Sequence, residues 1–579
     1  NPNYQVSVTA KTKPSEGDGT VIEDCKFTNN TGGVIEGESG GYGGSAVYIG
    51  APDCIIRDST FDNNTNGMNG GGYGGAIMIL INNPSASDAP KGVNATIFNC
   101  NFTGNNASSS GGSAYYGGAI CQLSSYTGSF NTNISQCIFK ENYAGDGGAL
   151  YLLGSNTVDN CTFINNTANR YGGALYLTSS DNNVAGCVFE ENKAENAQST
   201  ISNYGGAVYI GGSGYFTGSA HDNLIDNCSF EKNTADYGGA VYVANTGENT
   251  TIKDSNFTEN SAQLQAGAVA VYAPTEIISS RFDSNTAENG GAVLLSCNST
   301  NITKSNFTEN SADEGGAVYC IGSYNLIGDS NFTKNHASDN GGAVAMLPYI
   351  VPRDNTVYTS TGYEYYYNIP YKTGNNRITG STFDENYLSS EDGQGGAIYI
   401  CGCENETIKE CNFTNNTAYK GGAVSVVQFV SQNATKDVYY RPTRTWTRNI
   451  TLEYVFNSTG IVIDGDLFEG NIAENGGAMY WKDSDGEITD SNYTKNRAFS
   501  GSAIFLDSGY LNISDSSFFS NLANASALEM NGVDSSLPNK VVVDGDKVSF
   551  HANFTGHDNI NNAIFNNQED AGRIKFKNV

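Results

Sequence analysis

The residues best suited to chemistry in this chain are asparagines that begin N-x-S/T sequons. Six of them stand directly before an aromatic residue that is itself followed by threonine: Asn101, Asn256, Asn306, Asn331, Asn412 and Asn492. In a strand, the residues that flank an inward aromatic point outward, so we expect these amides at the surface. A surface sequon in a secreted protein is an acceptor for an N-linked glycan. Asn165 and Asn415 are further predicted acceptors. The alternative is that Asn and Thr merely suit exposed strand positions.

A second group of residues suits recognition of a partner. Two long inserts, at about 348–376 and 428–457, are rich in tyrosine and contain tryptophan and arginine. These residue types are enriched at binding surfaces because they are large, stiff and polar-tipped. The predicted partner-binding residues are Tyr365, Tyr366, Tyr367, Tyr439, Tyr440, Arg441, Arg444 and Trp446. The alternative is that the inserts are hairpins that pack on each other only for stability.

The sequence shows no clear pattern of residues for catalysis or for a bound metal. Acidic residues such as Glu309, Glu385 and Glu469 are spread over nearly every part of the chain, which is typical of a solvated face and not of paired catalytic carboxylates. The four histidines show no triad or metal partner. The D-G-D triplets at Asp464–Asp466 and Asp544–Asp546 could bind calcium, but each also suits a tight turn. We therefore expect no enzymatic activity and no cofactor.

A repeat of about 25 residues must position all of these groups. Ile or Val stands five residues before an aromatic residue, Cys or Ser two before it, Asn three after it, and Gly-Gly-Ala follows. A fixed period of this size indicates stacked supersecondary units. The aromatic residue stands at positions 27, 61, 102, 139, 163, 189, 230, 257, 282, 307, 332, 383, 413, 468, 493 and 518.

The side-chain parity within one repeat predicts its turns. Residues at −2 and 0 share a strand face, whereas the residue at −5 has the opposite parity, so a bend must separate them. Turn formers such as Asp24, Asn160 and Asp329 fill that bend. Asn at +3 marks a second bend and Gly-Gly a third. Three short strands and three bends predict an all-β fold, a parallel β-helix (solenoid) of about sixteen rungs. No window keeps the 3.6-residue period of a helix.

The repeat also divides the chain into segments. We expect residues 1–20 to form an N-terminal cap or the continuation of a longer chain, and residues 21–531 to form the β-helix. Residues 532–579 are predicted to be a C-terminal β cap or the start of a further module. Both long inserts leave the same corner of the β-helix two rungs apart, so they are expected to form a single lobe. Because the chain lacks an initiator Met, we expect it to be a segment of a larger polypeptide.

The net charge argues against one class of function, and the length of the apolar runs argues against another. The net charge of −30 argues against nucleic-acid binding, which needs a basic face. The longest apolar run, Ala76 to Ile81, is too short to span a membrane.

Seven of the thirteen cysteines occupy the −2 position of the repeat: Cys25, Cys100, Cys137, Cys161, Cys187, Cys228 and Cys411. Ser replaces Cys there in other repeats, so a small buried residue is favoured, and a free thiol behaves as a small hydrophobe. Stacked Cβ atoms about 4.8 Å apart also exceed the separation in a disulfide. We predict buried thiols, and a metal site at Cys401, Cys403 and Cys411 is the alternative.

The pairing of F-x-x-N with G-G-A-[ILV] resembles the repeats of polymorphic outer-membrane proteins, which are autotransporter β-helices used as adhesins. It is seen in FINN at Phe163–Asn166 and GGAL at Gly172–Leu175. Over almost its whole length the chain is similar to the adhesin-like surface proteins of methanogenic archaea, including FTGHDNINNAIFNN at Phe554–Asn567. The resemblance implies a right-handed β-helix in a large, secreted cell-surface protein, and it supplies no catalytic residues.

These observations lead to an expected function. We expect an extracellular, N-glycosylated adhesin or interaction protein at the cell surface that presents loops from a rigid β-helix. Its expected partners are glycans or proteins on host or neighbouring cells, or further copies of itself. One alternative is a structural subunit of a cell envelope, sheath or fibre. A second, less favoured alternative is a polysaccharide-degrading β-helix enzyme.

Overall fold

The structure is a computed structural model of the chain, which divides into two compact units, Asn1–Leu294 and Leu295–Val579. It describes residues 6–8, 19–32, 44–50, 53–67, 72–81, 92–108, 115–124, 129–196, 202–212, 219–353, 356–359, 362–431, 433–440, 443–519, 521–523, 528–530, 540–544, 549–551, 564–566 and 574–577.

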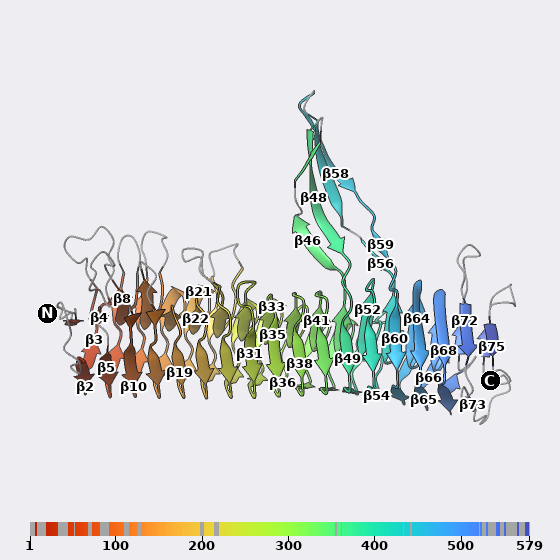
Figure 1. The fold of residues 1–579 in the computed structure, drawn as a ribbon, viewed down its shortest axis with the longest axis horizontal. Helices are drawn as coiled ribbons and strands as arrows, with labels where there is room; N and C mark the ends of the chain where they lie inside the picture. Colours follow the sequence, from red (N-terminus) through yellow and green to blue (C-terminus); the bar gives the residue numbers. More distant parts are fainter. Residues whose placement is uncertain are drawn as a thin grey trace. The chain divides into compact units, whose positions relative to one another are not determined.

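Each unit is a right-handed parallel β-helix, as the repeat predicts (Figure 1). Equivalent strands of successive repeats pair in parallel and in register: β39 (Asn306–Thr308) pairs with β43 (Asn331–Thr333), which sets Phe307 opposite Phe332. No described segment is a helix long and apolar enough to cross a membrane.

Four sheets surround the core of unit Leu295–Val579, and each rung contributes strands to them in the same order. The first sheet contains the Ile strands β38 (Asn301–Thr303), β42 (Leu326–Gly328), β49 (Arg377–Thr379), β53 (Thr407–Lys409), β60 (Ile461–Asp464), β64 (Ser484–Thr489), β68 (Gly509–Ser514), β72 (Lys540–Asp544) and β75 (Ile574–Lys577). The second sheet contains β39, β43 and the further Phe strands β50 (Thr382–Asp384), β54 (Asn412–Thr414), β61 (Leu467–Glu469), β65 (Asn492–Thr494), β69 (Ser517–Phe519) and β73 (Ser549–His551).

The remaining two sheets follow the Asn and the Gly-Gly of each repeat. The third-sheet strands are β40 (Ser311–Glu314), β44 (His336–Asn340), β51 (Tyr387–Leu388), β62 (Ile472–Asn475), β66 (Arg497–Ser500) and β70 (Leu522–Ala523). The fourth sheet contains β41 (Val318–Cys320), β45 (Val344–Met346), β52 (Ile398–Cys401), β55 (Val424–Val427), β63 (Met479–Lys482), β67 (Ile504–Leu506), β71 (Leu528–Met530) and β74 (Ile564–Asn566).

Unit Asn1–Leu294 repeats this arrangement. One of its rungs consists of β19 (Thr157–Asp159), β20 (Thr162–Ile164), β21 (Thr167–Tyr171) and β22 (Leu175–Leu177). Its second sheet runs from β3 (Lys26–Thr28) to β36 (Arg281–Asp283).

The structure differs from the sequence prediction in the number of strands per rung. Most rungs have a fourth short strand, because the chain stays extended between the Asn and the Gly-Gly. The second bend also lies one residue earlier than predicted. The left-handed residue there is Lys334 (φ 56°), directly before Asn335, while Asp329 (φ 49°) and Gly341 (φ 65°) make the other two predicted bends.

Columns of identical side chains fill the core. Phe307 and Phe332 are fully buried, with ring centroids 4.6 Å apart and an interplanar angle of 2°. In the other unit Phe163 and Phe189 stack in the same way at 4.7 Å. Buried isoleucines such as Ile302 and Ile327 stand in register beside this column. Parallel stacking of the rungs thus buries a continuous apolar core.

A ladder of buried asparagines closes the second bend. In Asn335, Nδ2 donates to the Phe307 carbonyl oxygen at 3.0 Å and to Asn386 Oδ1 at 3.0 Å. Its Oδ1 accepts from the backbone N and Nδ2 of Asn310 at 3.1 and 2.9 Å. All four hydrogen-bonding positions of the amide are therefore used.

All thirteen cysteines are free thiols, and eleven of them are buried. The −2 column contains Cys161, whose backbone N–H donates to Cys187 Sγ at 3.4 Å in the next rung. The Cys161 thiol donates to the Asp159 carbonyl oxygen at 3.3 Å. Six of the seven sulfurs in this column thus fill a small interior position, as predicted from their exchange with serine, and Cys25 is half-buried.

The described strands of the two terminal segments pair with the β-helix. Within residues 1–20, β1 (Val6–Val8) pairs in parallel with β4 (Val47–Ile49). Within residues 532–579, β72 pairs in parallel with β68 and β73 with β69, so Phe550 lies opposite Phe518. In the described residues this segment therefore adds further rungs to the same sheets.

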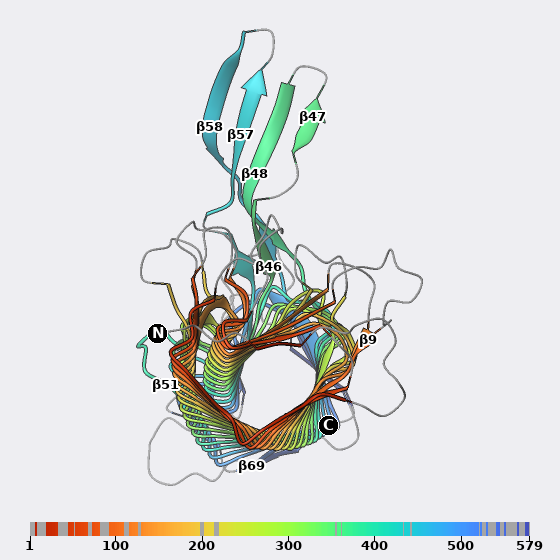
Figure 2. The same cartoon turned by 90° about the vertical axis from the view of Figure 1, so that its left-hand side faces the viewer.

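The two long inserts join in one antiparallel sheet, here called the lobe, which stands off the coils of its unit (Figures 1 and 2). β46 (Tyr349–Arg353) and β47 (Val357–Thr359) both pair with β48 (Gly362–Tyr371). β48 pairs with β57 (Thr435–Tyr440) of the second insert, and β57 pairs with β58 (Thr445–Thr451).

The asparagine ladder yields a stability prediction. Asn335→Leu removes all four side-chain hydrogen bonds and leaves the buried Phe307 carbonyl without the Asn335 donor. Since each unsatisfied buried group costs about 1–3 kcal/mol, we expect a loss of about 3–5 kcal/mol in the free energy of unfolding. Urea denaturation followed by circular dichroism measures it. Asn331→Ala, at an exposed position four residues earlier, is the control; an equal effect of both changes would contradict a special role for the ladder.

Candidate functional site

One face of the lobe carries a cluster of aromatic side chains, with Asp437 opposite Tyr365 on the same side. Register places Tyr363 opposite both Tyr358 and Tyr439, and Tyr439 opposite Trp446. Since opposed residues project to the same side of a sheet, these four rings share one face, and Tyr365 joins them two residues along β48. We call Tyr358, Tyr363, Tyr365, Tyr439 and Trp446 the aromatic face.

The rings of the aromatic face contact one another. The Tyr363 and Tyr439 centroids are 4.7 Å apart in a stacked arrangement, and Tyr439 lies 5.0 Å from Trp446. Tyr365 stacks on Trp446 at 5.8 Å. These contacts hold the rings in place, which lowers the entropy lost when a partner binds.

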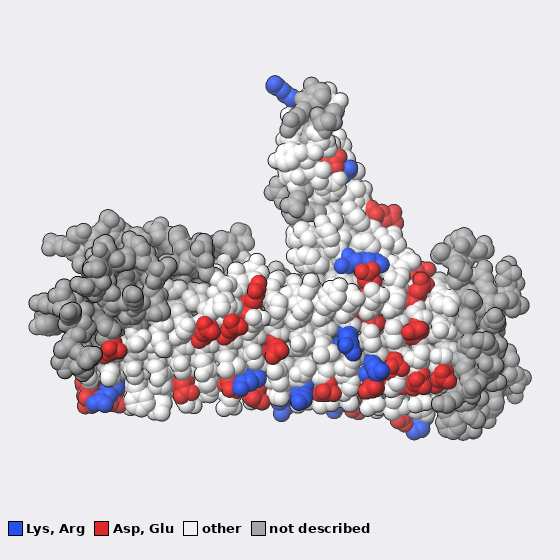
Figure 3. Space-filling view, in the orientation of Figure 1, with Lys and Arg blue, Asp and Glu red and all other residues white. Residues whose placement is uncertain are grey.

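The aromatic face is partly open to solvent. Tyr358 is 75% exposed and Trp446 is 38% exposed. The Arg448 guanidinium lies 5.4 Å from the centroid of the Trp446 ring, so a cation borders the face. Figure 3 shows few charged side chains on the visible side of the lobe, in contrast to the coils below it.

The opposite face of the lobe is polar. Lys436 Nζ lies 3.4 Å from the Glu364 carboxylate, and the Tyr366 hydroxyl donates to the same carboxylate at 2.5 Å. The Tyr366 hydrogen bond, together with Lys436, lowers the pKa of Glu364. Tyr440 is 43% exposed, and its register places it on this face.

The predicted partner-binding residues are therefore divided between two surfaces. Tyr365, Tyr439 and Trp446 lie on the aromatic face, and the register of Tyr367 places it on the same side. Tyr366 and Tyr440 lie on the polar face, Arg444 is exposed at the turn between β57 and β58, and Arg441 lies outside the described residues. Tyr358, Tyr363 and Arg448 belong to the inserts but were not among the predicted partner-binding residues, although the period-2 alternation of the inserts could have added them.

A short stalk connects the lobe to its rungs. β56 (Phe429–Val430) pairs antiparallel with β59 (Val455–Phe456), and the two phenylalanine rings stack at 5.9 Å. Gly402 has φ +65° and would meet Phe429 and Phe456 if it carried a Cβ. Glycine is therefore needed for the close approach of the stalk.

All eight predicted glycan acceptors are exposed: Asn101, Asn165, Asn256, Asn306, Asn331, Asn412, Asn415 and Asn492. Two of them are adjacent, because Asn331 Nδ2 donates to Asn306 Oδ1 at 2.8 Å across neighbouring rungs. Asn165 and Asn415 differ from the others, since they occupy left-handed bends with φ of 49° and 55°.

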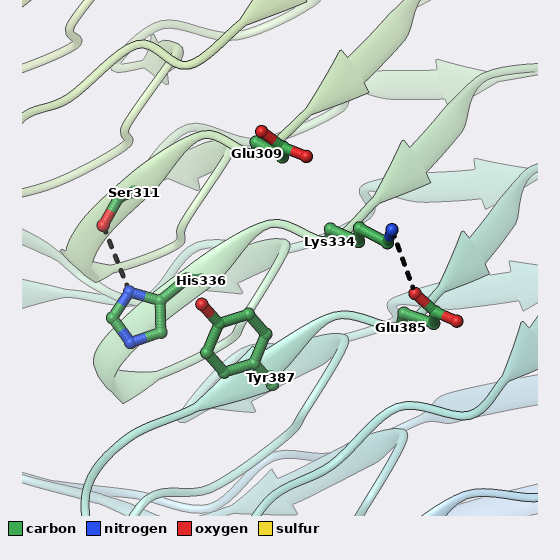
Figure 4. Close-up of a pocket in the computed structure, with 6 residues that line it drawn as sticks. All are labelled: Glu309, Ser311, Lys334, His336, Glu385 and Tyr387. Atoms are coloured by element: carbon green, nitrogen blue, oxygen red, sulfur yellow. Dashed lines mark hydrogen bonds and ion pairs between the residues drawn. The ribbon is translucent and has the colours of Figure 1, made fainter.

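A shallow polar hollow of about 460 Å³ lies over three rungs of unit Leu295–Val579 (Figure 4). Ser311 Oγ is 3.1 Å from His336 Nδ1, and the His336 ring is 4.7 Å from that of Tyr387. Lys334 Nζ is 3.5 Å from the Glu385 carboxylate, and Glu309 lines the same hollow. Partial burial lowers the pKa of His336.

The candidate metal ligands do not converge. Asp464 is bonded to Lys409 Nζ at 2.9 Å and Thr489 Oγ1 at 2.8 Å, whereas Asp466 is buried and accepts from the Cys411 backbone N–H at 2.6 Å. The D-G-D triplet is thus a turn with its two carboxylates on opposite sides. In the second triplet only Asp544 is described. Among the described residues, no group of three or more His, Cys, Asp or Glu is arranged to hold a metal ion, at Cys401, Cys403 and Cys411 or elsewhere.

Comparisons with known proteins give one partial match. The model of the Chlamydia polymorphic membrane protein repeat matches residues 160–178 and 227–244. No curated protein sequence matches the chain. A solved mannuronic acid specific polysaccharide family 6 lyase from human gut microbiota is similar at 10% identity, over 94% of this chain and 92% of that chain. Its TM-score of 0.28 is too low to carry an activity over to this chain.

The buried Asp466 predicts how stability depends on pH. Burial raises its pKa from 3.8 to about 7, so the folded state prefers the neutral acid. Its contribution is fully present below pH 3.8 and is lost as the pH rises through 7, by on the order of 2–4 kcal/mol. In Asp466→Ser, the residue type found at Ser491 of the next rung, we expect a higher urea midpoint at pH 8 and a smaller slope between pH 4 and 7.

Asp464→Asn is the matched control for this titration. Asp464 is two residues away and has a pKa lowered by Lys409 and Thr489, so its contribution is lost as the pH falls. Asp464→Asn should therefore leave the slope between pH 4 and 7 nearly unchanged, because the contribution of Asp464 is lost only below about pH 4. Equal slopes in Asp466→Ser and the unmodified chain would show that the buried carboxyl does not titrate as described.

Proposed function

We propose that this chain is a cell-surface adhesin and that the aromatic face of the lobe is the surface that contacts its partner. One observation carries the proposal: five aromatic side chains from two separate inserts share one face of the lobe, with Tyr358 and Trp446 exposed and the other three half-buried. The rungs of the unit do not need this face for their own packing. Long loops on a rigid scaffold are where binding residues concentrate.

The chemistry of the face indicates what it would bind. Aromatic rings with open faces stack on the apolar faces of sugar rings and also pack against apolar protein side chains. No carboxylate lies within ion-pair distance of Arg448 in the described residues, so its charge is available to an acidic group of the partner. Glycans or proteins on a host or neighbouring cell are therefore the proposed partners. Self-association through the same face is included.

The proposal places the chain outside the cell. The match to the polymorphic membrane protein repeat supports a surface location. The resemblance of the sequence itself to adhesin-like proteins of methanogenic archaea is the ground for proposing secretion and an archaeal source. The exposure of all eight predicted acceptors supports N-glycosylation, since each amide is accessible. The chain acts here as a binding protein without catalysis or a cofactor.

A test of the lobe compares its two faces. The double change Tyr363→Ser and Trp446→Ser removes two rings from the aromatic face. The single change Tyr440→Ser removes one ring from the polar face of the same sheet. Each aromatic anchor is worth about 1 kcal/mol or more, so binding should fall at least about tenfold in the double variant only. Beads coated with each chain would be tested on immobilised mannan, on hyaluronan and on intact cells of the source organism.

The outcomes separate the alternatives. Equal loss in the double variant and in Tyr440→Ser would contradict recognition by the aromatic face. Analytical ultracentrifugation of the same proteins detects self-association; if only that is lost in the double variant, the lobe serves an envelope or fibre assembly. Circular dichroism shows whether the coils remain folded.

The adjacent acceptors Asn306 and Asn331 give a separate prediction. Their strands are about 4.8 Å apart, which leaves little room for two glycans side by side. Both sequons lie in one tryptic peptide, residues 305–334, so mass spectrometry of material from the source organism reads their occupancy together. We expect mainly the singly modified peptide. A mainly doubly modified peptide would contradict the steric argument, and an unmodified one would contradict glycosylation at this pair.

A further inference from the structure

We propose that a glycan on Asn415 folds back along the third sheet and occupies the polar hollow beside Tyr387. The chain would thus bind the first sugars of its own modification. The inference rests on the N-glycosylation proposed above and does not depend on the lobe.

The first step is that the sequon Asn415–Thr417 lies in the rung after the hollow, in line with the two columns of residues that line it. Glu309, Lys334 and Glu385 occupy the left-handed bend of three successive rungs, with φ of 55°, 56° and 53°. Asn415 occupies the same bend in the next rung. Thr417, the hydroxyl residue of the sequon, is bridged in parallel to Tyr387.

The second step concerns the direction of the Asn415 amide. Its Oδ1 faces Gly470 in the following rung, 2.7 Å from where a Cβ on that glycine would lie. Because the amide is planar, Nδ2 lies on the other side and is turned away from Gly470. The side chain is exposed and makes no hydrogen bond to the described residues, whereas Nδ2 of Asn331 is bonded to Asn306. A sugar on Asn415 Nδ2 therefore starts toward the rung of Glu385 and Tyr387.

The third step is that the hollow suits a saccharide. Tyr387 is 45% exposed and offers a ring for stacking, and the His336 ring lies 4.7 Å from it. Ser311, Lys334 and Glu385 supply hydroxyl, ammonium and carboxylate groups that can bond sugar hydroxyls (Figure 4). Three rungs span about 10 Å, which is room for more than one sugar ring.

The same local arrangement recurs in unit Asn1–Leu294. Asn165 begins a second N-N-T sequon in a left-handed bend, and Thr167 pairs with Tyr143 of the preceding rung. Glu141 occupies the preceding bend, as Glu385 does before Asn415. Thus Glu-x-Tyr lies directly beneath Asn-x-Thr in both units.

The covalent step is ordinary glycosyl transfer. Asn415 Nδ2 forms a bond to the anomeric carbon of a glycosyl phosphate donor and gives one proton to a base of the transferring enzyme. The bond from that carbon to the phosphate oxygen breaks, and the phosphate leaves with its electron pair.

The test uses His336 as a reporter of whether the hollow is filled. Diethyl pyrocarbonate modifies neutral imidazole, and mass spectrometry gives the modification rate of His336 in the glycosylated chain from the source organism. The rate would be compared with Asn415→Gln and Thr417→Ala, two independent changes that remove this acceptor. Asn412→Gln removes a neighbouring acceptor on the second sheet, away from the hollow, and is the matched control.

We expect Asn415 to carry a glycan and His336 to react several-fold faster in both sequon variants but not in Asn412→Gln. An unmodified Asn415 in the source material would overturn the proposal. A glycan on Asn415 with an unchanged His336 rate would also overturn it, because the sugars would then extend into solvent. Neither outcome affects the lobe, so failure here is distinguishable from failure of the proposed adhesin role.

Discussion

The hydrogen bonds of the asparagine ladder are the interaction on which the coils depend. At the second bend the chain turns with buried backbone groups that the strand pairing alone does not satisfy. Asn335 bonds the Phe307 carbonyl of the preceding rung and joins the amides of Asn310 and Asn386. A buried amide has two donors and two acceptor sites, and all of them are used here. Once this corner is fixed, register places phenylalanine on phenylalanine and isoleucine on isoleucine. The ladder therefore sets the rung geometry from which both inserts and sequons project.

Much of this fold could be predicted from the sequence because every rung repeats the same constraint. The alternation of side chains along a strand predicted that the Ile and the Phe of each repeat lie on separate strands. Asp329 and Gly341 were recognisable as turn residues. The fourth strand was not predicted, since only the alanine two residues after the asparagine recurs there, as Ala337 after Asn335, and the residues between it and the Gly-Gly vary. The bend before Asn335 was placed one residue late, because Lys334 has no turn preference that marks it. Local strain there is overcome by the pairing of the whole rung.

The candidate site could be predicted only in part. Composition identified the two inserts, and their common corner indicated one lobe. Composition alone could not divide their tyrosines between two faces, because that depends on the register of β48 with β57. The hollow at Tyr387 was missed for a different reason: its residues come from three repeats and are ordinary polar residues in each. Only stacking brings Ser311, His336 and Tyr387 together.

The pairing of β48 with β57 also has a mechanical consequence for the stack of rungs in this unit. The two inserts leave rungs on either side of the one that contains β52, and their sheet joins those outer rungs outside the coil. Under tension along the stack, the rungs of a solenoid would separate one pair at a time. Here β52 cannot part from both neighbours until the six opposed residue pairs of β48 and β57 are sheared. The lobe thus links the rungs that contain β45, β52 and β55, so that these three rungs resist tension together.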